Sequence, residues 1–271
     1  MTTGDKDRTS RLIDLGKSAV SVFASALEEA LLASEIDVAV HSLKDLATAP
    51  THGTVLAALP RRGDPRDALC GSTLADLPSR ARVGTGSPRR IAQLLALRPD
   101  VSTTPIRGNV PPRLRRAREL GLNGVILATA GLRRLGLGNE ITEALDLDLY
   151  PPSPAQGVIA VQVREGDTRL RELVAAVHDE TTATAATAER ALLAELHGGC
   201  SVPVGALATV DGDRLRLIAQ VSSLDGTNVV RAQQTGAVFD PADLGKRSAS
   251  ALLDQGAEGI LSRIRNTPSN P

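Results

Sequence analysis

Aromatic side chains are nearly absent from this sequence of 271 residues, which contains two Phe, one Tyr and no Trp. Proteins that bind single-stranded nucleic acid stack the bases on aromatic rings, so this class of protein is essentially excluded. Cysteine is scarce too, with Cys70 and Cys200 as the only two. Two cysteines form neither a disulfide framework nor a zinc-ligand set, and we therefore expect no metal site and a cytoplasmic location with reduced thiols.

The sequence also lacks an excess of either charge, because Lys plus Arg and Asp plus Glu both number 31. It contains no run close to the roughly 20 apolar residues of a membrane span. Residues 1–12 (MTTGDKDRTSRL) have no apolar secretory core. We therefore expect neither a nucleic-acid nor a membrane partner. Any anionic ligand must be held by a local cluster of basic side chains.

Strands and helices alternate through residue 150, which predicts a mixed or parallel α/β sheet. The apolar periodicity favours a helix over residues 18–35 and another that opens at Pro88, directly after a Gly/Ser turn. Short apolar strands are predicted in the same region, over residues 36–42, 54–60, 82–85 and 124–128.

The pattern changes after the Pro-rich segment PPSPAQG at 151–157, which is followed by one more strand, VIAVQV. Residues 168–197 are predicted to be helical. Three longer strands then follow, joined by the hairpin signals DGD and LDG, and a helix over 242–265 closes the chain. We interpret residues 180–271 as a small α+β domain.

Arginine recurs at three predicted strand-to-helix corners. Arg89 and Arg90 follow the first corner, Arg107 and Arg113 flank the second, and Arg133 and Arg134 follow the third. Such corners gather at the carboxyl edge of a parallel sheet, where helix N-termini favour anions. Any single arginine could be an ordinary surface residue. Their recurrence, together with the planar fork of the guanidinium, predicts a ligand with several carboxylates.

A turn that contains Lys44 and Asp45 ends the strand AVHS. A carboxylate at this place can stabilise a cation or accept a hydrogen bond during catalysis, or it can simply cap the turn. His41, two residues before the turn, is interpreted as a structural residue.

Cys200 follows two glycines in the segment ELHGGCSVPVGA, between a predicted helix and a strand. Gly198 and Gly199 could form an ordinary helix C-cap beside a small buried cysteine. Alternatively, they leave room for a large group attached to an accessible sulfur. Spacing alone does not decide between these interpretations.

Eight motifs occur in an order that resembles the porphobilinogen deaminase (hydroxymethylbilane synthase) family: AVHSLKD, DPRDAL, VGTGSPRR, IRGNVPPRL, ATAGLRRLGL, PAQGVIAV, TAERALLAEL and GGCSVPVGA. The similarity runs from about residue 14 to the C-terminus. It implies two α/β domains like those of periplasmic binding proteins, the first of them incomplete, and a small C-terminal α+β domain. The implied boundaries are 1–57 with 158–177, 62–153, and 180–271.

The resemblance implies a monomeric transferase of heme and tetrapyrrole biosynthesis. It would join four porphobilinogen molecules head to tail, with loss of ammonia, into hydroxymethylbilane. A dipyrromethane cofactor would be attached to Cys200 through a thioether. The implied catalytic residue is Asp45, and Lys17 and Phe23 would belong to a substrate loop. The residues implied to bind the carboxylates of the cofactor and growing chain are Lys44, Thr85, Ser87, Arg89, Arg90, Arg107, Gly108, Arg113 and Arg134.

The chain departs from the family at its beginning, where the family's opening strand, helix and R.S.LA..Q motif are not found. We therefore expect this chain to be inactive or nearly so. Two alternatives follow, a truncated inactive homologue or a non-catalytic anion-binding protein. An intact-mass measurement separates them from the enzyme, because only the enzyme carries a dipyrromethane adduct on Cys200.

Overall fold

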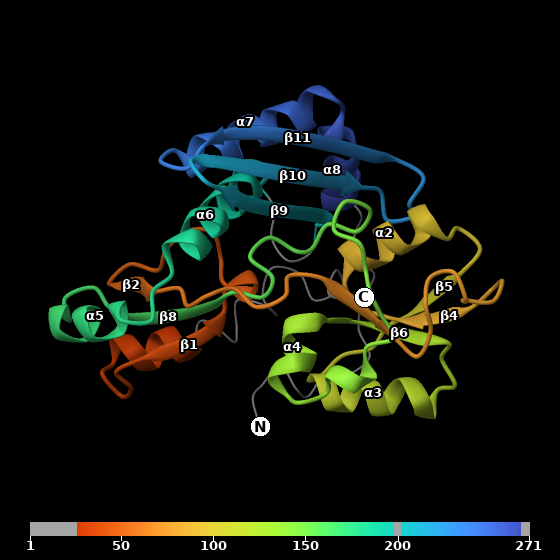
Figure 1. Ribbon diagram of the computed structural model, residues 1–271, viewed down its shortest axis with the longest axis horizontal. Coiled ribbons are helices and arrows are strands. Elements are labelled where there is room, and N and C mark those ends of the chain that lie inside the picture. The colour runs from red at the N-terminus through yellow and green to blue at the C-terminus, as the bar shows by residue number, and fades with distance from the viewer. Residues whose placement is uncertain (1–25, 198–201, 267–271) are drawn as a thin grey trace.

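The computed structural model describes residues 26–197 and 202–266. Within these ranges the chain forms three β-sheets, each with its own helices (Figure 1). The mixed α/β class predicted from the alternation of strands and helices is therefore confirmed. No helix within the described ranges is long and apolar enough to cross a membrane.

The first sheet has the order β1-β8-β2 and is antiparallel throughout. Its strands are β1 (Ala39–Ser42), β8 (Ile159–Arg164) and β2 (Thr54–Ala58), and α5 (Thr168–Ala175) packs against it. β1 runs directly into the short 3-10 helix η2 (Leu43–Asp45). His41 is buried and hydrogen-bonded to the Gln162 side chain, so its structural interpretation is confirmed.

The second sheet has the order β5-β4-β6-β3-β7, with β4 parallel to both β5 and β6. The carboxyl ends of these three strands therefore share one edge, as the arginine pattern predicted. The strands are β3 (Asp67–Cys70), β4 (Arg82–Gly84), β5 (Ser102–Thr104), β6 (Gly124–Ala128) and β7 (Glu143–Ala144). The helices are α2 (Pro88–Leu97), α3 (Val110–Glu119) and α4 (Thr129–Arg134), followed by η3 (Gly138–Glu140).

Apolar cores cover both faces of this sheet. Leu69, Val83 and Ile126 contribute to one core, and Val125 and Leu127 to the other. The continuous apolar run of β6, GVILA, is typical of a strand in a sheet that is buried on both sides.

The third sheet is an antiparallel meander in the order β11-β10-β9. It consists of β9 (Val204–Asp211), β10 (Arg214–Ser222) and β11 (Val229–Ala237). The helices α6 (Glu180–Glu195), α7 (Pro241–Asp254) and α8 (Ala257–Asn266) pack with it around one aliphatic core. Figure 1 shows α6 extending from this sheet towards the first one.

Two regions predicted as continuous helix are each divided in two. The region 168–197 contains α5 and α6, because the Asp179 side chain accepts a hydrogen bond from Thr182 N and caps a new helix. The region 242–265 contains α7 and α8. Gly256 separates them with a φ of +94°, a left-handed conformation that ends a helix.

The three sheets meet at the segment 151–157. The Arg62 and Arg134 side chains donate to its carbonyl groups at Gln156 and Gly157. Gly157 has a φ of +87°, and a Cβ atom there would lie 2.7 Å from the Gly63 carbonyl oxygen. The close pairing of these two glycines therefore fixes the path of the segment.

Candidate active site

A cavity of about 360 Å³ lies where the three sheets meet. Lys44 and Asp45 reach it from the turn after β1, and Gln156 from the segment that joins the sheets. The second sheet contributes residues from all three of its carboxyl-edge corners: Ser87, Arg89, Arg90, Gly108, Arg113 and Arg134. The corners predicted to meet therefore do meet, and they face the Asp45 turn.

Local structure explains why these side chains converge. Pro88 occupies the first turn of α2, which places Arg89 and Arg90 immediately after β4. Gly108 has a φ of +99° at the corner that leads into α3, and its carbonyl accepts a hydrogen bond from Arg113 Nε. Arg134, at the end of α4, donates from Nη2 to Gly157 O over 2.7 Å. One nitrogen of each of the last two guanidinium groups is thus fixed to the backbone.

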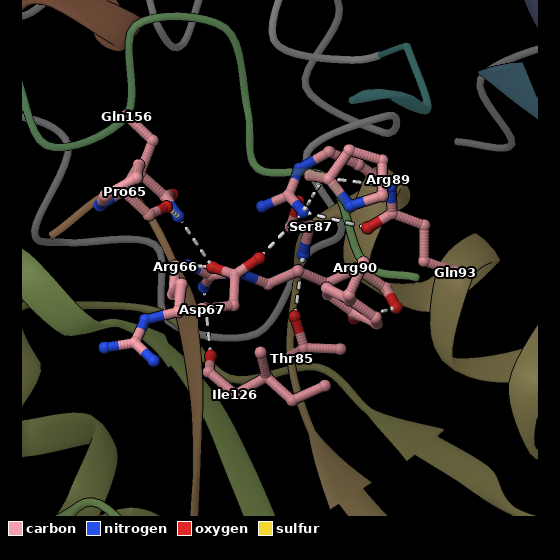
Figure 2. Close-up of polar contacts among 12 residues, drawn as sticks. Pro65, Arg66, Asp67, Thr85, Ser87, Arg89, Arg90, Gln93, Ile126 and Gln156 are labelled. Atoms are coloured by element: carbon pink, nitrogen blue, oxygen red, sulfur yellow. Dashed lines mark hydrogen bonds and ion pairs between the residues drawn. The ribbon is translucent and has the colours of Figure 1, made fainter. Parts of the chain in front are cut away.

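Asp67 lies buried beneath the cavity and organises two of its arginines (Figure 2). Its Oδ1 lies 2.7 Å from Arg90 Nη2, and its Oδ2 lies 2.7 Å from Arg89 Nη1. Gln156 Nε2 donates to the same Oδ1 over 3.0 Å. Although burial alone would raise the pKa of Asp67, the two arginines hold it well below its usual range. Asp67 is therefore ionised and neutralises one of the two cations.

The remaining positive charge is concentrated on the wall of the cavity. Burial lowers the pKa of Lys44 to about 8 against an opposing effect of Asp45, and Arg90 and Arg89 lower it further. Burial likewise lowers the pKa of Arg113 to about 10, and repulsion from Arg90 and Arg107 adds to the effect. Crowded cations of this kind gain stability from a bound anion.

Asp45 is the one acidic residue that lines the cavity within the described ranges. Its side chain is exposed, and its charge acts on both Lys44 and Arg113. The cavity thus combines a cationic wall suited to several carboxylates with a single carboxylate that can face a developing cation.

Most of the predicted site residues are brought together. Asp45, Lys44, Ser87, Arg89, Arg90, Gly108, Arg113 and Arg134 line the cavity. Thr85 and Arg107 lie just outside its lining: the Thr85 hydroxyl accepts from Ser87 N, and the charge of Arg107 acts on Arg113. Lys17, Phe23 and Cys200 lie outside the described residues.

The structure distinguishes arginines that the sequence treats alike. Arg133, which stands beside Arg134 in the third corner, is mostly exposed and pairs with Asp64 instead of lining the cavity. Cys70 is buried at the end of β3, and burial raises the pKa of its thiol to about 11. Cys70 is therefore a poor nucleophile.

Sequence reasoning missed Gln156 and Asp67. Both stand in motifs that were recognised, PAQG and DPRDAL, but neither residue type in isolation indicates a role. The Lys44 ammonium donates to Gln156 Oε1 over 3.2 Å, so Gln156 connects the Asp45 turn to the Asp67 cluster. No group of three His, Cys, Asp or Glu side chains in the described ranges could hold a metal ion.

Comparison with known protein families matches two parts of the chain to the same family. The profile described as "Porphobilinogen deaminase, dipyromethane cofactor binding domain" matches residues 1–172, and the profile for the C-terminal domain of the same family matches residues 183–254.

Curated relatives of this chain carry the name porphobilinogen deaminase, and three of them illustrate the similarity. The protein of Thermobifida fusca is 52% identical over 89% of this chain and 79% of its own length. That of Roseiflexus castenholzii is 49% identical over 89% of this chain and 80% of its own. That of Acidothermus cellulolyticus is 45% identical over 100% of this chain and 84% of its own. The two alternatives, a truncated inactive homologue and a non-catalytic anion-binding protein, are therefore not favoured. The chain belongs to the porphobilinogen deaminase family, the transferases that condense porphobilinogen into hydroxymethylbilane on a dipyrromethane cofactor.

Proposed function

We propose that the cavity at the meeting of the three sheets is the active site for this condensation. Asp45 is its catalytic carboxylate, and the surrounding lysine and arginines bind the carboxylates of the cofactor and of the growing chain. The observation that carries the proposal is the juxtaposition of one acidic side chain, Asp45, with Lys44 and four arginines around one cavity.

The donor set fits a dipyrromethane. Each of its pyrroles bears an acetate and a propionate, so the cofactor brings several negative charges. Lys44 and four arginines line the cavity beside one acidic residue, Asp45, so cationic side chains outnumber acidic ones in the described lining. Anionic groups would relieve that excess, and the guanidinium forks of Arg113 and Arg134 would bind them in two-point contacts. When bound, the cofactor supplies the pyrrole α-carbon to which substrate units are joined. Cys200, in the family's GGC motif, is the proposed point of attachment.

The proposed task of Asp45 is electrostatic. As ammonia leaves the aminomethyl carbon of porphobilinogen, positive charge develops on the pyrrole nitrogen of the substrate. A carboxylate fixed beside that N–H stabilises the charge and needs no reorganisation when the reaction occurs. The turn that carries Asp45 is well suited to this, because Leu43 and Leu46 on either side of it are buried.

Arg89 and Arg90 have a second task besides binding anions. Because both are paired with Asp67 beneath the cavity, each guanidinium is held in place before a ligand arrives. This preorganisation lowers the entropy cost of binding a flexible polycarboxylate. Gln156 joins Lys44 to the same cluster, so the cationic wall spans the first and second sheets.

The proposed domain organisation follows the three sheets. Residues 1–57 with 158–177 would form the first domain and 62–153 the second, arranged like the lobes of a periplasmic binding protein. Residues 180–271 would form the third. In support, each range contains the strands of one sheet, except that β2 extends one residue beyond the first range, to Ala58. We further propose a cytoplasmic monomer whose partner is porphobilinogen and not a nucleic acid.

The experiment that tests the function uses the Asp45→Asn variant and measures ammonia release from porphobilinogen. Asparagine keeps the shape of the side chain and removes its charge, so turnover should fall by roughly 100-fold or more while the fold is preserved. The control is Asp76→Asn, at an acidic residue outside the cavity lining. Turnover of Asp45→Asn equal to that of the control would remove Asp45 from the mechanism.

A further inference from the structure

The turn that carries Asp45 is bound by a side chain of α6. The Arg190 guanidinium donates from Nη2 to the carbonyl oxygens of Ala47, at 2.6 Å, and Thr48, at 3.3 Å. Its Nη1 donates to Leu46 O at 3.3 Å and to Leu43 O at 3.5 Å, the longest of the four contacts. One side chain thus contacts four carbonyl groups that begin in η2 and continue directly beyond it.

The Leu43 and Leu46 carbonyl groups belong to the carboxyl end of η2, and those of Ala47 and Thr48 belong to the segment directly after it. η2 is a single 3-10 turn, and it ends with Leu46 N donating to Leu43 O. The carbonyl end of a helical turn carries partial negative charge, which a cation stabilises. Burial lowers the pKa of Arg190, and no carboxylate within residues 26–197 and 202–266 offsets this effect. The charge of Arg190 is therefore directed at the backbone of the Asp45 turn.

The turn that carries Asp45 is held by two sets of contacts, one to the core of the first sheet and one to Arg190. Leu43 N donates to Val158 O, and the buried Leu43 and Leu46 side chains pack in the core of the first sheet. Arg190 holds the carbonyl side. Asp45 lies between these anchors and lines the cavity. The position of its carboxylate relative to Arg113 and Lys44 therefore depends on the Arg190 contacts.

The helix that carries Arg190 belongs to two cores. Ala186 packs in the core of the first sheet, whereas Ala188 and Leu192 pack in the core of the third. In the sequence, the same helix leads to Cys200, ten residues after Arg190. A rigid helix thus connects the Asp45 turn with the approach to the cysteine.

We infer that Arg190 is a positioning residue for the condensation: it couples the helix that leads to Cys200 to the turn that carries Asp45, and so places the catalytic carboxylate against the cationic wall. This inference rests on the proposed function of Asp45 and Cys200. Arg190 acts on the reaction only through Asp45. It therefore affects turnover more than it affects the binding of porphobilinogen.

The test compares Arg190→Met, which removes the donors and keeps the length of the side chain, with Arg169→Met at an exposed arginine of α5. Rates of ammonia release are normalised to the fraction of chains with the cofactor adduct, determined by intact mass. Arg190→Met should lower kcat by about 10- to 100-fold and change KM less than about twofold, since a small displacement of a catalytic group is enough for such a loss. Arg190→Lys, which retains the charge, should restore part of the loss. An unchanged kcat in Arg190→Met would overturn the inference.

A double variant separates positioning from general destabilisation. If Arg190 acts through Asp45, then adding Arg190→Met to Asp45→Asn should slow turnover by less than about twofold. A further loss as large as in the wild-type background would overturn the inference, since it would show an independent structural effect. If Arg190→Met does not fold, the same cycle is carried out with Arg190→Lys. Wild-type turnover in Asp45→Asn alone would instead contradict the proposed function, whatever Arg190 does.

Discussion

The guanidinium of Arg62 and the carboxylate of Glu189 form a two-point ion pair, with 2.6 Å from Nη1 to Oε1 and 3.2 Å from Nη2 to Oε2. Glu189 is completely buried on α6 and also accepts from Ala155 N and Ala208 N. One carboxylate therefore contacts three parts of the fold: Ala155 in the segment 151–157, Ala208 in β9 of the third sheet, and Arg62, which lies between β2 and β3. A substitution that removes an acceptor oxygen from this buried group would leave a buried donor unpaired.

Glu189→Gln should reduce the free energy of unfolding by about 3–5 kcal/mol, because an amide cannot accept all four hydrogen bonds and leaves Arg62 without a counter-charge. The measurement is urea unfolding followed by circular dichroism. The control is Glu180→Gln at the first residue of the same helix, where the side chain is 91% exposed. A midpoint equal to that of the control would show that the pair contributes nothing to stability.

Cys200, and not Cys70, should carry the cofactor. Cys70 is buried and its thiol has a raised pKa, so it is both inaccessible and weakly nucleophilic. Intact mass spectrometry of Cys200→Ser should show the bare chain, and Cys70→Ser should keep the adduct. The opposite pattern would show that the assignment is wrong.

Arg113→Leu and Arg134→Leu should each weaken the binding of the polyanionic chain by about 1.5–3 kcal/mol, the range for a lost charge-assisted hydrogen bond. Arg107→Leu should act in the same direction. Lysine at these positions should recover only part of the loss, because an ammonium lacks the planar fork with which a guanidinium makes a two-point contact to a carboxylate. The measurement is the KM for porphobilinogen, with Arg133→Leu, at a mostly exposed arginine, as the control. Complete recovery by lysine at all three positions would indicate diffuse attraction instead.

Lys44 should make substrate binding sensitive to pH. Its pKa in the folded protein is about 8, compared with an ordinary value of 10.5. Below about pH 8 the ammonium is charged and attracts carboxylates; as the pH rises through this value the charge is lost and affinity falls. The KM for porphobilinogen should therefore increase between pH 7 and 9, measured in steps of about half a unit. Lys44→Arg keeps its charge over this range, and the increase should be smaller. Identical profiles for both proteins would exclude Lys44 as the titrating group.

The sequence predicted much of the site because its signals are local. β4 is followed by a Gly/Ser turn and Pro88, and β5 is followed by Gly108 and α3. These turn residues determine how far the neighbouring arginines lie from the end of each strand. The parallel order of β4, β5 and β6 then brings these ends together. The shared position of Arg89, Arg113 and Arg134 on one cavity follows from this geometry, whereas Asp45 reaches the same cavity from η2, after β1 of the first sheet.

What the sequence could not provide depends on contacts between residues far apart in the chain. Arg133 and Arg134 are adjacent and chemically alike, yet one pairs with Asp64 and the other lines the cavity, because α4 directs them to different sides. Asp67 looks like an ordinary strand residue until α2 places two arginines over it.

By itself, then, the sequence determined the family, the α/β class and the cationic character of the site, because each of these is indicated by motifs and patterns of residues that lie close together in the chain. The tertiary structure alone decided which charges are neutralised. A side chain's pKa, its counter-ion and the orientation of its fork depend on neighbours that only folding brings near. In the same way, only folding brings Arg190 within hydrogen-bonding distance of the backbone carbonyl groups of the Asp45 turn, which lies about 140 residues earlier in the chain.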